Sequence, residues 1–284
     1  MNEQFTKKMY WLHCLSPLHL GSGEGAGYID NPLMREKVTG FPFVPGSSIK
    51  GVIKAQYSGS ENGNTAFGTG GDNQDKAGAL IFTDAYLICL PVRSLYGTFA
   101  WVSAPLVLNR LQRDWAELPA IPEVSAVQIS LTENSVLTKD GKVFLEDLDL
   151  TVQKSEESAK IADKIAKNLW QDNQNKWQEI FKQRFAIVSD VVFSFLSETA
   201  TQVDTRIRIN PDSDVVDKGA LWTEESLPAE SILAGMVYCD NQLKSDKDLL
   251  KDYCTEEIAL QLGGNITVGR GQTRCVFSNA EESS

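Results

Sequence analysis

The amino-acid sequence predicts an α+β domain, and three observations favour this fold class. Strand-like and helix-like patterns alternate along the 284 residues without the regular spacing of a dinucleotide-binding fold. Strand patterns occur near both ends of the chain, at residues 8–15 and 272–277, so one sheet can join the two ends. Apolar residues make up 42% of the chain, which is enough for the core of one large domain or of one domain with insertions.

The first predicted elements are a strand at residues 8–15 and a helix that begins near Ser47. The strand residues alternate with a period of two, and a Ser-Pro pair follows them. Ser47 is a candidate N-cap, because apolar residues recur on one stripe from there to Tyr57. Lys50 and Lys54 lie one turn apart on the flank of this helix.

The middle of the chain predicts a long loop, a buried strand and a β-rich segment. Residues 58–78 are rich in Gly, Asn, Asp and Ser and predict a surface loop. Residues 78–90 are apolar on both faces, which is typical of a central strand. A helix opens at Pro105, and residues 121–150 look β-rich with a hairpin turn at 139–142. The other elements are strands at 98–102 and 231–240, two helices within 155–185, and a helix at 244–262.

Basic side chains gather in a predicted protruding hairpin over residues 206–222, whose turn is at residues 210–214. Arg206 and Arg208 alternate with isoleucines on its first arm, where they can contact phosphates. With the helix lysines and Arg270 they form a coherent basic set, although each also fits a solvated helix flank or an exposed turn. The sequence has no signature of a standard RNA-recognition motif.

Composition and charge limit the class of protein. A formal net charge of −11 argues against a stand-alone nucleic-acid binder, so any such role requires local basic patches. The five cysteines are scattered, and the start of the chain has no secretion signal, which predicts reduced thiols. The longest apolar runs are too short to cross a bilayer. We therefore expect a soluble cytoplasmic protein with no membrane partner.

Two glycine clusters, at residues 19–30 and 263–271, predict loops where a large partner can approach the main chain. The first cluster does not match the dinucleotide-binding pattern, because Ala26 occupies a required glycine position. Of the two histidines, His13 is expected to be packed within its strand. His19, beside the loop, is the better functional candidate, although a plain turn residue fits equally well.

Asp30 follows the first glycine cluster, and by composition alone its Asp-Asn-Pro context is an ordinary turn. A carboxylate on a mobile loop opposite a phosphate-lined groove is also what RNA cleavage requires. The 2′-hydroxyl must lose a proton as it attacks its own phosphate, with metal assistance or general-base catalysis.

Longer motifs show a resemblance to a known family. They are Leu18-His19-x-Gly21-Ser22-Gly23, Asp30-Asn31-Pro32-Leu33-x-Arg35-Glu36, Pro45-Gly46-Ser47-Ser48-Ile49-Lys50-Gly51, Pro91-Val92-Arg93-Ser94, Ala220-Leu221-Trp222-x-Glu224-Glu225 and Gly263-Gly264-Asn265-x-Thr267-x-Gly269-Arg270-Gly271. Together they resemble the RAMP superfamily of CRISPR proteins, and most closely the repeated backbone subunit of type III-B (Cmr) effectors.

The resemblance implies a ferredoxin-like, RNA-recognition-type core that spans residues 1–284 as one domain. Its insertions are the 58–78 loop, a β and helical segment at about 121–190, and a thumb hairpin at about 200–228. The Gly- and Asn-rich 58–78 loop departs from the family pattern. Copies of such a subunit stack helically along a guide CRISPR RNA beside other Cmr subunits, and each thumb displaces one nucleotide of the single-stranded target RNA.

The resemblance also implies an activity, the guide-directed cleavage of target RNA in antiviral defence. Asp30 is the residue on which cleavage depends, with a divalent cation such as Mg²⁺ or Mn²⁺. His19, Trp222 and Glu225 match positions near this site: Glu225 can orient the cation, and His19 or Trp222 can hold the displaced nucleotide. The implied RNA-binding residues are Ser47, Ser48, Lys50, Lys54, Arg93, Arg206, Arg208, Gly264 and Arg270.

Two other functions stay open at the level of sequence. One is a structural guide-RNA-binding subunit that has no catalytic role. The other is a ribonuclease that processes the guide precursor through His19 without a metal. Measurements of RNA cleavage separate the three hypotheses. Asp30→Ala should stop cleavage only if this subunit cleaves target RNA through Asp30, and cleavage that persists in a chelator would favour the metal-independent ribonuclease.

Overall fold

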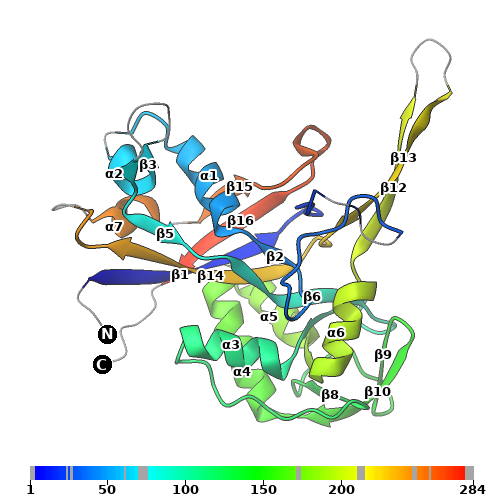
Figure 1. The fold of residues 1–284 in the computed structure, drawn as a ribbon. Coiled ribbons are helices and arrows are strands. Elements are labelled where there is room, and N and C mark those ends of the chain that lie inside the picture. The colour runs from blue at the N-terminus through cyan, green and yellow to red at the C-terminus, as the bar shows by residue number, and fades with distance from the viewer. Residues whose placement is uncertain are drawn as a thin grey trace.

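A large sheet brings strands from both ends of the chain together (Figure 1). The computed structural model describes residues 4–23, 25, 28–60, 62–69, 76–170, 174–209, 215–244, 248–255 and 257–278. The sheet has 12 strands, with the main order β15-β16-β1-β14-β6-β7-β11-β8-β10-β9. In addition, β2 (Phe43–Val44) pairs with β6, and β5 pairs with β14.

The first half of this sheet is a ferredoxin-like core. Its elements are β1 (Phe5–Cys14), α1 (Gly46–Gln56), β5 (Leu80–Phe82) with β6 (Ala85–Arg93), β14 (Ile232–Asp240), α7 (Leu249–Tyr253) and β16 (Gln272–Ser278). The order β16-β1-β14-β6 is antiparallel throughout. Counted as β-α-β-β-α-β, the strands lie in the order 4-1-3-2, which confirms the predicted α+β class and ferredoxin-like topology.

The predicted strand at residues 78–90 is interrupted at Thr83 and Asp84, which separate β5 from β6. The Asp84 carboxylate accepts a hydrogen bond of 2.9 Å from the Gly46 amide, at the start of α1. A Cβ on Gly46 would lie 2.2 Å from the Phe82 carbonyl oxygen, so only glycine fits there. The prediction of Ser47 as the N-cap is therefore wrong: Pro45 is the N-cap, and Asp84, between β5 and β6, satisfies the Gly46 amide.

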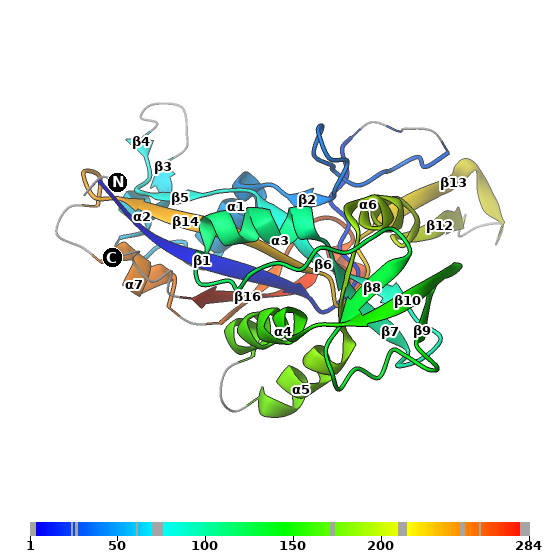
Figure 2. The same ribbon diagram turned by 90° about the horizontal axis from the view of Figure 1, so that it is seen from below.

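Helices cover both faces of the core (Figures 1 and 2). On one face the rings of Tyr57, Phe67 and Tyr253 join α1, α2 (Gly63–Phe67) and α7. Residues 58–78 are thus not a simple loop, because burial of Phe67 supports α2 and a small ribbon of β3 (Gly68–Thr69) with β4 (Lys76–Ala77). Residues 61 and 70–75 of this segment lie outside the described residues.

A long insertion between β6 and β14 extends the sheet and covers its other face (Figure 2). Its elements are β7 (Phe99–Ser103), α3 (Pro105–Asp114), β8 (Gln128–Leu131), β9 (Lys142–Leu145), β10 (Leu148–Lys154), α4 (Glu156–Leu169), α5 (Asn175–Arg184), β11 (Phe185–Val188) and α6 (Asp190–Thr199). The rings of Trp101 on β7, Trp170 at the end of α4 and Phe181 on α5 pack together and join these helices to the sheet. Ser189 caps α6, a helix that the sequence analysis did not predict.

The turn predicted at residues 139–142 is present. Lys139 and Lys142 exchange backbone hydrogen bonds of 3.1 and 3.0 Å, and Asp140 and Gly141 have positive φ angles. The predicted hairpin pairs residues 136–137 with 143–144, but residues 143–144 belong to β9, which pairs with the following β10.

The prediction of one helix over residues 244–262 is wrong. The segment holds the short α7 and then β15 (Ile258–Gln261), an edge strand that pairs with β16. Leu249, Leu250 and Tyr253 are buried against the core. The apolar spacing therefore corresponds to a helix only over the short α7. Residues 245–247 and 256 lie outside the described residues. The 3-10 helix η2 (Ile266–Val268) precedes β16.

The thumb hairpin is formed by β12 (Gln202–Ile209) and β13 (Val216–Ser226), a separate two-stranded sheet that projects from the body (Figure 1). The prediction of a protruding hairpin is confirmed, and its turn at residues 210–214 lies outside the described residues. None of the helices in the described ranges is long and apolar enough to cross a bilayer.

All five cysteines are unpaired and buried, as the sequence predicts for reduced thiols. Burial raises the pKa of Cys14 and of Cys254 to about 12. Burial also raises the pKa values of the other three thiols. These thiols therefore stay protonated at neutral pH.

Candidate functional site

The two glycine clusters meet beside the thumb root, the part of the hairpin nearest the body, where residues 202–206 of β12 pair with residues 222–226 of β13. The Gly264 amide donates a hydrogen bond of 3.0 Å to the His19 carbonyl oxygen, and the Gly271 amide donates one of 2.9 Å to the Pro17 carbonyl oxygen. Gly263 has φ +73°, and a Cβ there would lie 2.0 Å from the His19 carbonyl oxygen. Glycine is required at this crossing, and the sheet joins the two loops as the sequence predicts.

Asp30 is exposed and lies against Thr223 on β13. Its Oδ2 accepts hydrogen bonds from the Thr223 amide at 2.7 Å and the Thr223 hydroxyl at 2.9 Å. Its own amide donates to the same hydroxyl at 3.0 Å. The backbone bond and then the hydroxyl bond lower the pKa of Asp30. Both hydrogen bonds from Thr223 reach the same carboxylate oxygen, Oδ2.

Residues 30–33 run alongside β13 as a short added strand. The Asn31 amide donates to the Thr223 carbonyl oxygen, and the Glu225 amide donates to the Asn31 carbonyl oxygen, each at 3.0 Å. The Leu33 amide donates to Glu225 Oε2 at 2.9 Å. The Asp30 segment is therefore fixed to the thumb root at both of its ends.

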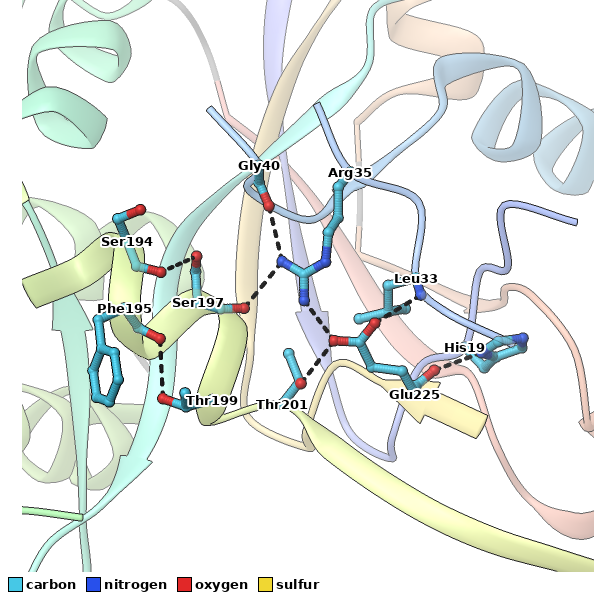
Figure 3. Close-up of polar contacts among 10 residues, drawn as sticks. All are labelled: His19, Leu33, Arg35, Gly40, Ser194, Phe195, Ser197, Thr199, Thr201 and Glu225. Atoms are coloured by element: carbon cyan, nitrogen blue, oxygen red, sulfur yellow. Dashed lines mark hydrogen bonds and ion pairs between the residues drawn. The ribbon is translucent and has the colours of Figure 1, made fainter. Parts of the chain in front are cut away.

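Glu225 is buried, and its carboxylate is occupied (Figure 3). Oε1 accepts hydrogen bonds from Arg35 at 2.5 Å and from the Thr201 hydroxyl at 2.8 Å, while Oε2 accepts the Leu33 amide. Its carbonyl oxygen lies 2.5 Å from His19 Nδ1. Both carboxylate oxygens of Glu225 are thus engaged by protein donors, and the carboxylate orders the surrounding chain. A role for Glu225 in orienting a cation stays a prediction.

Trp222 and Thr223 project to opposite faces of the hairpin, because successive side chains of a strand alternate. Trp222 is half-buried and lies directly across from Arg206. Asp30 bonds the hydroxyl of Thr223, so Trp222 is on the other face of β13 from that contact. This placement separates Trp222 from the Asp30 carboxylate, although both belong to the thumb root.

The arginines on and beside the thumb hairpin are paired with carboxylates. Arg206 lies 3.4 Å from Glu224, and Arg208 lies 2.9 Å from Asp217. Arg270, from the terminal glycine loop, lies 2.7 Å from Asp204. Among the described residues, Arg206 Nε and Arg270 Nη1 are buried with no hydrogen-bond partner. Each of these two guanidinium groups therefore keeps one N–H donor that the described protein groups do not satisfy.

The other predicted RNA contacts lie on different elements. Lys50 and Lys54, on α1, donate to the Leu80 and Gly68 carbonyl oxygens, each at 2.8 Å. Burial, followed by the neighbouring Lys54, lowers the pKa of Lys50. Ser47 and Arg93 are exposed, and Ser48 is half-buried. The structure thus groups His19, Asp30, Trp222, Glu225, Arg206, Gly264 and Arg270 at the thumb root but places the α1 residues and Arg93 elsewhere.

Sequence reasoning gave no role to Arg35, Thr201 or Thr223, which hold the site together. Arg35 stands in the motif at residues 30–36, but only the folded chain shows its partners. In the described part of the chain, no group of three or more His, Cys, Asp or Glu side chains is arranged to hold a metal ion. A cation at Asp30 would therefore rely on this one carboxylate together with oxygen atoms from a ligand and from water.

Comparison with known proteins defines the class. The model of the RAMP superfamily matches residues 11–274, so the chain belongs to that superfamily. It is 36% identical over 273 residues to the CRISPR system Cmr endoribonuclease Cmr4 of Pyrococcus furiosus, covering 92% of each protein. It is 24% identical over 294 residues to the CRISPR system CMR subunit Cmr4 of Saccharolobus solfataricus, covering 93% of this chain and 94% of that one. Within the superfamily the chain belongs to the Cmr4 family, which confirms the resemblance seen in the motifs.

Solved structures agree with this assignment. Oligomeric Cmr4 from Pyrococcus furiosus superposes with a TM-score of 0.74 at 28% identity, covering 96% of this chain and 97% of that chain. A chain of the type III-B Cmr-beta complex bound to cognate target RNA gives the same TM-score of 0.74 at 18% identity. At that identity the second match concerns the fold alone.

Proposed function

We propose that this protein is the repeated backbone subunit of an RNA-guided type III-B CRISPR effector and that it cleaves guide-paired target RNA. The observation that carries the proposal is Asp30, an exposed carboxylate with a lowered pKa, fixed at the root of the thumb. The family relation supports it, since a relative 36% identical is named an endoribonuclease. The partners would be the guide RNA, the single-stranded target RNA, further copies of this chain and other Cmr subunits.

The acidic chain can bind RNA because its basic groups are local. Arg206 and Arg270 each keep one unpartnered buried donor atom beside the glycine loops, where the backbone is open to close approach. The face of the thumb opposite Arg206 exposes Val203, Ile207 and Leu221, an apolar surface suited to contact with a base that has left its stack. The thumb therefore offers basic groups and an apolar contact surface close to Asp30.

Cleavage at this site would be a transesterification within the target RNA. The 2′-hydroxyl oxygen forms a bond to the adjacent phosphorus as its proton passes to water, the bond from phosphorus to the 5′-oxygen breaks, and that oxygen takes up a proton from water. The products are a 2′,3′-cyclic phosphate and a 5′-hydroxyl. Thr223 keeps Asp30 ionised and oriented through its two hydrogen bonds to Oδ2. The guide supplies sequence specificity through base pairing.

A divalent cation, Mg²⁺ or Mn²⁺, fits this donor set. Mg²⁺ is commonly held by one or two carboxylates together with substrate phosphates and water, and Asp30 is the protein residue that would hold it. When bound, the cation supplies charge neutralisation at the phosphodiester. Glu225 would contribute indirectly, because its carboxylate is already engaged by Arg35, Thr201 and Leu33.

The test uses the reconstituted effector complex with guide and target RNA. Asp30→Ala should leave the complex assembled and stop cleavage, while wild type gives evenly stepped products that end in cyclic phosphates. Asp149→Ala, an exposed carboxylate on β10, is the matched control and should cleave normally. Unchanged cleavage by Asp30→Ala would show that this subunit is only a structural RNA holder. Cleavage that persists in a chelator would favour metal-independent processing through His19.

A further inference from the structure

The guanidinium of Arg35 joins three segments that are far apart in sequence (Figure 3). Nη1 donates to the Gly40 carbonyl oxygen at 2.8 Å and to the Ser197 carbonyl oxygen at 3.1 Å, and Nη2 donates to Glu225 Oε1 at 2.5 Å. Gly40 belongs to the same loop as Arg35. Ser197 lies in the last turn of α6, where a cation is favoured by the helix dipole.

Glu225 connects Arg35 to both arms of the thumb and to the Asp30 segment. Thr201, which it binds at 2.8 Å, immediately precedes β12, while Glu225 itself is part of β13. Its other oxygen holds the Leu33 amide, three residues from Asp30. The Glu225 side chain is only 3% exposed, so loss of Arg35 would leave a buried carboxylate without its charge partner.

We propose that Arg35 is a positioning residue for RNA cleavage. By holding Glu225, it keeps residues 30–33 in register along β13 and so fixes the Asp30 carboxylate relative to the thumb. This inference rests on the proposed function. Because a misplacement of about 1 Å can lower a reaction rate about 100-fold, the arrangement predicts a large effect on the chemical step without a direct contact to RNA.

The neighbouring residue supplies a matched control. Glu36 forms two hydrogen bonds, of 2.8 and 2.7 Å, with Arg110 on α3. This ion pair has a similar partial burial, with 25% of the Arg110 side chain and 16% of the Glu36 side chain exposed. The Glu36–Arg110 pair involves the same loop as Arg35, but it attaches this loop to α3. It should therefore stabilise the fold without controlling the Asp30 segment.

The experiment compares Arg35→Met, Arg35→Lys, Arg110→Met and Asp30→Ala in the assembled complex. The measured quantities are the single-turnover cleavage rate, the Kd for target RNA and the melting temperature. Arg35→Met should cleave about 100-fold more slowly with its Kd within about threefold of wild type. Arg35→Lys should recover part of the rate, and Arg110→Met should lower the melting temperature but keep the rate within about threefold.

The outcomes separate this inference from the proposed function. If Arg110→Met slows cleavage as much as Arg35→Met at an equal loss of melting temperature, Arg35 has only a structural role and the inference is wrong. If Asp30→Ala stops cleavage but Arg35→Met cleaves normally, the inference fails and the proposed function stands. Normal cleavage by Asp30→Ala overturns the proposed function. Should Arg35→Met fail to assemble, Glu225→Gln tests the same ion pair with nearly unchanged shape.

Discussion

Thr223 holds one oxygen of Asp30 with both its amide and its hydroxyl, at 2.7 and 2.9 Å. The two donors stabilise the ionised carboxylate and lower its pKa, with the backbone bond as the larger cause. The same residue sets the direction of the carboxylate, because both bonds reach Oδ2. An otherwise ordinary Asp-Asn-Pro turn thereby becomes an oriented anion at the edge of a hairpin.

Thr223→Val should raise the pKa of Asp30, because the hydroxyl bond is lost and the amide bond remains. A reaction that needs ionised Asp30 loses rate as pH falls through that pKa, so the acidic limb of the pH–rate profile should move to higher pH. Single-turnover rates from acidic to neutral pH measure this limb. Thr205→Val, directly opposite on β12, is the control, and an identical profile for the two variants would contradict the assignment.

Gly263→Ala should destabilise the protein strongly, because a Cβ would lie 2.0 Å from the His19 carbonyl oxygen at a φ of +73°. We expect a loss of at least about 2 kcal/mol in the free energy of unfolding. Gly264→Ala has ordinary space, with its nearest contact at 3.7 Å from a His19 carbon, and should lose much less. Denaturant unfolding of the two variants makes the comparison, and equal losses would mean that the loops do not cross as described.

Asp204→Asn should strengthen guide-RNA binding. Its carboxylate pairs with Arg270 at 2.7 Å and competes with RNA phosphate for that side chain. Once Arg270 is released, the slope of log affinity against log salt should steepen by about one unit. Arg270→Ala should weaken binding and flatten the slope. Binding titrations at several salt concentrations test both variants, and weaker binding by Asp204→Asn would show that the ion pair itself forms the binding surface.

The ion pair between Glu257 and Arg274 should stabilise the protein only above acidic pH. Arg274 lowers the pKa of Glu257 in the folded state. A carboxyl whose folded pKa is depressed contributes stability above its unfolded value of about 4.3, and this contribution disappears as pH falls through the folded pKa. Wild type should thus exceed Glu257→Gln in melting temperature at neutral pH, and the two should converge in acid. A difference that persists in acid would exclude this origin.

The sequence allowed the strands of the core, the two helices around residues 155–185 and the thumb to be predicted, because their periodic patterns are local. The pattern failed where a distant partner decides the structure. Asp84, in the break between β5 and β6, accepts a hydrogen bond from the first amide of α1, and the edge pairing of β15 replaces a predicted helix. Arg35 and Glu225 are separated by 190 positions, so their ion pair has no local pattern at all. Asp30 and His19 were found by motif, but their orientation depends on such long-range contacts.

The buried, protonated cysteines give the protein a practical property. Thiol-reactive dyes require an accessible thiolate, so the native cysteines should not react with such dyes under mild conditions. A cysteine introduced at exposed Leu221 on the thumb would then be the single labelled position. A fluorophore there would report the arrival of a nucleic acid at the hairpin in real time, without first removing any native sulfur atom.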